Sequence, residues 1–145
     1  MAITFSVNIE AFELLEKKKV KEWLTALIEE QGKHVGTIGY LFCDDEFVLD
    51  ANQRYLNHDT YTDIITFDYV EGDLISGDIM ISVERVRDNA EKFNVSFDDE
   101  LHRVIAHGVL HLLGQGDKSE AEASEMRKKE EYALLKWHEI RQIKI

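Results

Sequence analysis

The residues best suited to chemistry lie in segment 107–117, which reads His-Gly-Val-Leu-His-Leu-Leu-Gly-Gln-Gly-Asp. At about 100° per residue, His107 and His111 project from one face of a helix, one turn apart, and can share a small cation. The two glycines that follow let the chain reverse and carry Asp117 back toward both rings. Two imidazoles, a carboxylate and an open position for water are typical of catalytic zinc sites. We therefore expect one divalent metal ion, with zinc favoured.

A histidine pair at this spacing also has an ordinary explanation. The chain contains six histidines, and two of them on an apolar helix can be core residues that bond to backbone or carboxylate. The residue after the first histidine narrows the chemistry, because helical zinc proteases carry their general base there in the pattern H-E-x-x-H. Gly108 occupies that position here. Peptidase chemistry of that style is disfavoured, and hydrolysis would need metal-activated water or a base elsewhere.

Length and composition limit the kind of protein that carries these residues. The 145 residues are 44% hydrophobic and 32% charged, which predicts one compact domain over 1–145 with a core of its own. No apolar stretch reaches the length of a membrane span, no secretory signal is recognisable, and the single Cys43 excludes an internal disulfide. We expect a cytoplasmic protein with no membrane contact. Because the net charge is -12, binding of RNA phosphates would require local basic clusters or a partner.

The elements that must position these side chains follow from periodicity and capping signals. Alternation and β-branched runs predict strands, including a hairpin around an acidic turn at 71–73, while apolar spacings of three and four predict helices. Ser82, Ser96 and Ser119 stand at expected helix N-caps. We expect an α+β fold in which a small mixed β-sheet packs with helices and the ligand helix lies in the C-terminal half. The strands are expected at 3–9, 37–43, 62–69 and 77–83, and the helices at 14–31, 44–56, 83–93, 96–114 and 119–137.

The segment around the histidine pair resembles the signature of the YbeY family of metal-dependent endoribonucleases, H-G-x-L-H-L-x-G-Y-D-H. Further matches to family segments occur in the same order along the chain, over more than half of its length. A single motif that arose by chance would not be accompanied by these further matches. They are Asn52 and Tyr55 for N-x-x-Y, 62–67 for T-D-V-L-S-F, 77–79 for G-D-I, and Met126 and Glu130 for M-x-x-x-E. The resemblance implies an endoribonuclease of ribosomal RNA maturation, with RNA and the ribosome or its proteins as partners.

The sequence departs from the family pattern at two places. The third family histidine falls on Asp117, so the resemblance carries the ligand role to His107 and His111 directly and to Asp117 by position. A carboxylate should acidify bound water less than a third imidazole, and its hard oxygen makes manganese harder to exclude. The arginine that follows N-x-x-Y in the family falls on Leu56. If that arginine binds phosphate in relatives, a neighbour must do so here.

Two arginines are candidates for this catalytic role. Arg54 lies near Leu56, and Arg103 lies four residues before His107 on the ligand side of the same helix. A guanidinium beside a metal suits a phosphodiester whose charge grows in the transition state. An ion pair of Arg103 with Glu100 or Asp99 is the equally good alternative. Two further groups are weaker candidates: His58, Asp59 and Asp63 for the cleft, and the basic runs 17–21 and 127–129 for RNA contact.

Three functions therefore remain open from the sequence. The first is a metal-dependent endoribonuclease that hydrolyses RNA phosphodiesters at a His-His-Asp zinc site. The second is a non-catalytic ribosome-associated factor whose metal only stabilises the fold. The third is a metal-dependent hydrolase of another substrate, such as a peptide. The oligomeric state is left open.

Overall fold

The computed structural model describes residues 2–58 and 60–142, which form a four-stranded mixed sheet packed with helices. The strands are β1 (Ala2–Val7), β2 (His34–Cys43), β3 (Ile64–Asp68) and β4 (Leu74–Ser82), in the spatial order β1-β2-β4-β3. Strand β2 runs parallel to both β1 and β4, and β3 pairs antiparallel with β4. The expected α+β fold with a small mixed sheet and a hairpin around the acidic turn is confirmed.

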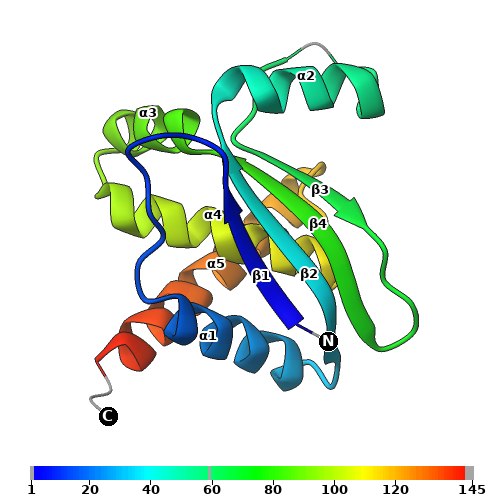
Figure 1. Cartoon of the computed structure of the whole chain (residues 1–145). Helices are drawn as coiled ribbons and strands as arrows, with labels where there is room; N and C mark the ends of the chain where they lie inside the picture. Colours follow the sequence, from blue (N-terminus) through cyan, green and yellow to red (C-terminus); the bar gives the residue numbers. More distant parts are fainter. Residues whose placement is uncertain (1, 59, 143–145) are drawn as a thin grey trace.

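Five helices accompany the sheet, and side-chain caps fix where four of them begin. They are α1 (Lys17–Glu30), α2 (Asp45–Leu56), α3 (Val83–Phe93), α4 (Phe97–Leu112) and α5 (Glu120–Arg141). Ser82, Ser96 and Ser119 cap α3, α4 and α5 as expected, and Ser119 forms a complete capping box with Glu122. Helices α1, α4 and α5 lie on one side of the sheet, and α2 lies at one end of the other side (Figure 1).

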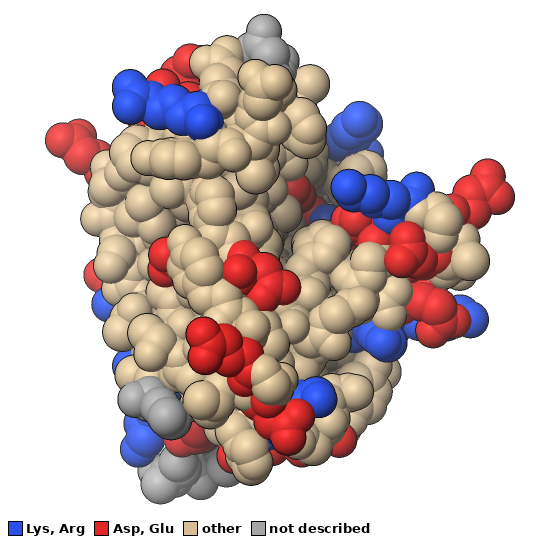
Figure 2. All heavy atoms as spheres, turned by 90° about the vertical axis from the view of Figure 1, so that its right-hand side faces the viewer, with Lys and Arg blue, Asp and Glu red and all other residues tan. Residues whose placement is uncertain are grey.

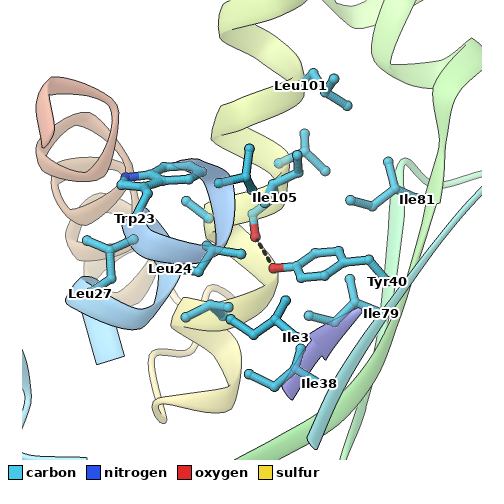
Figure 3. Close-up of a cluster of buried hydrophobic side chains, with 14 of the residues drawn as sticks. Ile3, Trp23, Leu24, Leu27, Ile38, Tyr40, Ile79, Ile81, Leu101 and Ile105 are labelled. Atoms are coloured by element: carbon cyan, nitrogen blue, oxygen red, sulfur yellow. Dashed lines mark hydrogen bonds between the residues drawn. The ribbon is translucent and has the colours of Figure 1, made fainter. Parts of the chain in front are cut away.

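The main core fills the space between the sheet and the helices on its covered face. Buried aliphatic side chains of α1, α4 and the strands interdigitate there, and Trp23 and Trp137 pack with ring centroids 5.2 Å apart. Tyr40 is fully enclosed and satisfies its hydroxyl by donating to the carbonyl of Ile105, 2.7 Å away (Figure 3). This hydrogen bond ties the middle of the sheet to α4, the helix that carries both expected ligands.

Gly108 has a packing reason to be glycine. A Cβ atom at this position would approach the Cδ1 atom of Ile79 to 2.9 Å and the side chain of Ile64 to 3.2 Å. The small residue therefore lets α4 press closely against β3 and β4. A glutamate, the base that helical zinc proteases place here, would have no room, which gives the missing H-E-x-x-H pattern a structural cause.

The expected element boundaries differ from the structure mainly at the first and last helices. Helix α1 begins at Lys17 rather than 14, because Glu16 adopts a left-handed backbone angle, φ 58°, that a helix cannot contain. Helix α5 continues to Arg141, where the sequence favoured an end near Trp137. Among the described residues, no helix is both long and apolar enough to span a bilayer.

Candidate metal centre

The structure brings His107, His111 and Asp117 together at the C-terminal part of α4. The Nε2 atoms of His107 and His111 each lie 3.3 Å from Oδ2 of Asp117. The two imidazole rings are nearly perpendicular, with centroids 4.5 Å apart. Gly114, at φ +100°, ends the helix and turns the chain back, so that Asp117 reaches both rings. One ligand atom from each of the three side chains lies within 4.8 Å of the others.

The spacing and chemistry of these donors fit a small divalent ion. Tetrahedral zinc with bonds of about 2.0–2.1 Å to nitrogen and oxygen holds its donors about 3.3–3.4 Å apart. The observed separations of 3.3 Å match this edge length. Lone pairs of two imidazoles and a carboxylate that face one another also repel unless a cation lies between them. The group can therefore hold a metal ion.

Glu130 orients the first of these imidazoles. Nδ1–H of His107 donates to Oε2 of Glu130 over 2.6 Å, which leaves the Nε2 lone pair directed toward Asp117. The carboxylate is buried in α5 and also pairs with Arg103, whose Nη1 lies 2.8 Å from Oε1. Burial acts to raise the pKa of Glu130, but the hydrogen bond from His107 and the charge of Arg103 outweigh it and lower that pKa. Glu130 is thus ionised and rigidly held.

Arg103 is engaged within the protein and does not line the hollow at the metal centre. Its guanidinium donates to Glu100 as well as to Glu130, and its side chain is only 16% exposed. Burial acts to lower the pKa of Arg103, and the two carboxylates more than compensate and raise it. The alternative of an ion pair with Glu100 is therefore realised, although in the interior rather than on the surface.

Arg54 also lies away from the metal centre. Its side chain is 69% exposed and pairs with Asp50 one turn earlier in α2. Leu56, at the position of the family arginine, does line the hollow beside the histidines. The structure therefore brings neither predicted arginine to the site, because Arg103 is bound by its two carboxylates and Arg54 projects from a different face of α2.

The three ligands open into a hollow of about 630 Å³ between α2, β3 and the turn after α4. Lys118 is the one lysine or arginine among the described residues that line it. Asp63 lines it as well, and burial raises the pKa of this carboxyl against the opposing charges of His107 and Arg103. His58 is a third lining residue, whereas Asp59 lies outside the described residues. Sequence reasoning missed Lys118, although its place beside Asp117 was the available signal.

The remaining candidates take structural or surface positions. His102 is buried with its ring stacked on Trp137, and Cys43 is buried beneath α2. The basic runs lie on α1 and α5, and none of their residues lines the hollow. On the face drawn in Figure 2, basic side chains are scattered among acidic ones and form no broad patch.

The fold and the site together define a class: a mixed α/β protein with a metal-binding group on a buried helix, the organisation of a metal-dependent hydrolase. Residues 5–138 match the family model described as Endoribonuclease YbeY, and the chain belongs to this family. A relative from Flavobacterium johnsoniae, named Endoribonuclease YbeY, is 52% identical over 94% of this chain and 97% of its own length.

Further relatives agree with this assignment. A protein of the same name from Bacteroides thetaiotaomicron is 47% identical over 92% of this chain and 98% of its own length. The solution structure of a Thermotoga maritima protein superposes with a TM-score of 0.70 at 28% identity, and it covers 97% of this chain and 92% of that one. The resemblance inferred from the motifs is confirmed.

Proposed function

We propose that this protein is a metal-dependent endoribonuclease that hydrolyses RNA phosphodiesters, with the ion held by His107, His111 and Asp117. Family membership supports RNA as the substrate, and the observation that carries the chemistry is the convergence of three donor atoms, with Oδ2 of Asp117 3.3 Å from the Nε2 atoms of both histidines. A divalent ion bound there supplies a Lewis acid for a phosphoryl oxygen and lowers the pKa of water. We propose zinc as that ion, because two of the three donors are imidazoles.

The protein's own groups provide positioning and charge around this centre. Glu130 accepts the Nδ1 proton of His107 and so keeps the Nε2 lone pair available. We assign contact with the RNA phosphate to Lys118, since it lines the hollow where Leu56 leaves no cation. The carboxylate of Asp63 is assigned as the proton acceptor, because it lines the same hollow and burial raises its pKa toward that of a useful base.

The substrate in the cell is proposed to be ribosomal RNA, with the ribosome or its proteins as partners, as the family resemblance implies. The acidic surface supports a partner that delivers the RNA. A chain of net charge -12 has little long-range attraction for phosphates. A ribosomal surface that already holds the RNA would therefore bring the RNA to the protein.

The test of this function uses two substitutions at one position. Asp117→Leu removes a donor, so zinc content and RNA cleavage should both be lost, while Asp117→His restores a donor and should retain both. His138→Ala, an exposed histidine that pairs with Asp99 on the other end of α4, is the matched control. If Asp117→Leu cleaves RNA like the wild type, the assigned centre is wrong.

If a chelator lowers the melting temperature while the protein cuts no RNA with any divalent ion, the non-catalytic factor is the right function.

The roles of the two further residues are separable by kinetics. Lys118→Ala should raise KM for RNA with little change in zinc content, and Lys118→Arg should restore it because the charge returns. Asp63→Asn should lower kcat by about 10²-fold or more at unchanged zinc content, which is the usual contribution of general base catalysis. Unchanged kcat in Asp63→Asn would exclude the carboxylate as the proton acceptor.

A further inference from the structure

A second hollow lies on the face of the sheet that α1, α4 and α5 leave uncovered. Strand alternation places Leu41, Phe67 and Met80 on this face. Helix α2 covers only its end, where Val48 and Ala51 pack against the sheet. The rest forms a hollow of about 620 Å³. An apolar sheet face left open in this way marks a binding surface rather than a solvent-facing one.

Three aromatic rings from two elements line this hollow. Tyr55 reaches it from α2 and Phe67 from β3, with ring centroids 5.8 Å apart and planes at 89°. Tyr69 follows β3 and continues its ladder by donating its N–H to the carbonyl of Ser76 over 3.0 Å, so it shares the face of Phe67. Tyr55 and Tyr69 are 67% and 58% exposed, and within the described part of the chain neither hydroxyl has a hydrogen-bond partner. Both rings are therefore accessible to a ligand.

The chemistry of the lining selects an uncharged planar ligand with polar edges. No lysine or arginine is among the described residues that line the hollow, so a phosphate has no counter-charge there. Asp78 and the hydroxyls of Thr4 and Ser6 lie beside the aromatic rings. An aromatic surface next to a carboxylate that accepts from amino groups suits a nucleobase, which stacks through its face and donates through its edge. Contact through bases also avoids the repulsion between RNA phosphates and this acidic protein.

Strand β3 separates this hollow from the hollow at the metal centre. Strand β3 is the edge of the sheet, and Thr66 and Asp68 line the metal side while Phe67 lines the other. Helix α2 is divided in the same way, because Leu56 lines the metal hollow and Tyr55 the aromatic one. A single strand of RNA whose phosphodiester lies at the metal can therefore pass over β3 and place neighbouring nucleotides on the aromatic rings. The Cα atoms of positions 67 and 69 are about 6.8 Å apart along the strand, a step suited to successive nucleotides.

We propose that Tyr55, Phe67 and Tyr69 form a base-stacking subsite for single-stranded RNA flanking the phosphodiester that is cut. This subsite rests on the proposed endoribonuclease function, and the nucleotides that it holds must be unpaired, since bases inside a duplex cannot reach a protein ring. Stacking tolerates every base, so the subsite should show little preference for sequence.

The experiment measures binding separately from cleavage. Tyr55→Ala and Tyr69→Ala are introduced into a His111→Ala background, and affinity for a fluorescent single-stranded RNA that contains 2-aminopurine is measured by anisotropy. Each change should weaken binding by about five- to 150-fold, the usual loss for one stacked base, and should reduce the quenching of 2-aminopurine. Tyr55→Phe, which keeps the ring, and Tyr132→Ala, an equally exposed ring on α5, should bind like the parent.

The outcomes separate the subsite from the nuclease. If the wild type cleaves RNA but Tyr55→Ala and Tyr69→Ala bind it like the parent, the subsite is wrong and the function stands. If the wild type never cuts RNA, the function is wrong, and the same affinity comparison still decides whether bases stack here. Loss of a dimer in Tyr55→Ala, with RNA affinity unchanged, would assign the face to a second copy of the chain and overturn the proposal.

Discussion

Substitution of Glu130 by glutamine tests how the first ligand is positioned. The two carboxylate oxygens each accept from a different donor, Nδ1 of His107 at 2.6 Å and Nη1 of Arg103 at 2.8 Å. Glutamine offers one oxygen and one NH2 group. The NH2 group faces either the N–H of Arg103 or Nδ1 of His107, and in the second case the ring must move its proton to Nε2, the atom that would bind the ion. In either arrangement the buried guanidinium of Arg103 loses one of its two carboxylate partners. The cost to folding is about 3 kcal/mol.

The same change should weaken the metal centre. Loss of the carboxylate that orients a ligating imidazole typically lowers metal affinity by about 10- to 100-fold. Glu130→Gln should therefore lower both the urea midpoint of the apo protein and the zinc affinity, measured by competition with a chromophoric chelator. Glu131→Gln, the exposed neighbour on the same helix, should change neither. If Glu130→Gln is destabilised but binds zinc like the wild type, the carboxylate is only structural and the reasoning about tautomer and orientation is refuted.

Three further predictions concern packing and ionisation. Gly108→Ala should destabilise the fold by about 1–3 kcal/mol in urea unfolding, because the added Cβ meets Ile79 at 2.9 Å, and an unchanged midpoint would contradict that tight fit. Burial raises the pKa of Cys43 to about 12, so iodoacetamide at pH 8 should label it only as fast as the protein unfolds; rapid native labelling would contradict this. The hydrogen bond from Arg141 lowers the pKa of Asp98, so this pair stabilises the fold fully above the ordinary carboxyl pKa and is lost as the pH falls through the lowered one. The stability gap between wild type and Asp98→Asn should therefore close below about pH 4, and a gap that persists at low pH would exclude the ionised pair.

The parts of the fold that could be predicted from the sequence are those that short-range signals determine. Serine caps and apolar spacing place α3 and α4 almost to the residue, because these signals act within one helical turn. The predicted start of α1 is wrong, since no short-range signal in the sequence marks the left-handed backbone angle at Glu16. The strand order was beyond reach for the same reason: β2 and β4 pair in parallel across some thirty intervening residues, and no short-range pattern encodes that contact.

The candidate site also combines residues that short-range spacing predicts with one whose contacts depend on the tertiary structure. The two histidines follow from helical periodicity and Asp117 from the glycine turn, so spacing alone brought the three residues together. The buried ion pairs of Arg103 could not be predicted from spacing, because its second partner, Glu130, lies 27 residues later on another helix. Charge on the ligand face of α4 suggested a phosphate contact, whereas the tertiary structure uses that charge to hold Glu130.

The bond between Glu130 and His107 has a consequence for the order of assembly. Everything that completes the centre, from the turn at Asp117 to the carboxylate at Glu130, comes from the last fifth of the chain. Synthesis proceeds from the N-terminus, so the sheet and both histidines emerge before the group that aims one of them. A nascent chain thus acquires the complete set of donors, with His107 oriented, only after residues 117–130 have emerged and packed against α4.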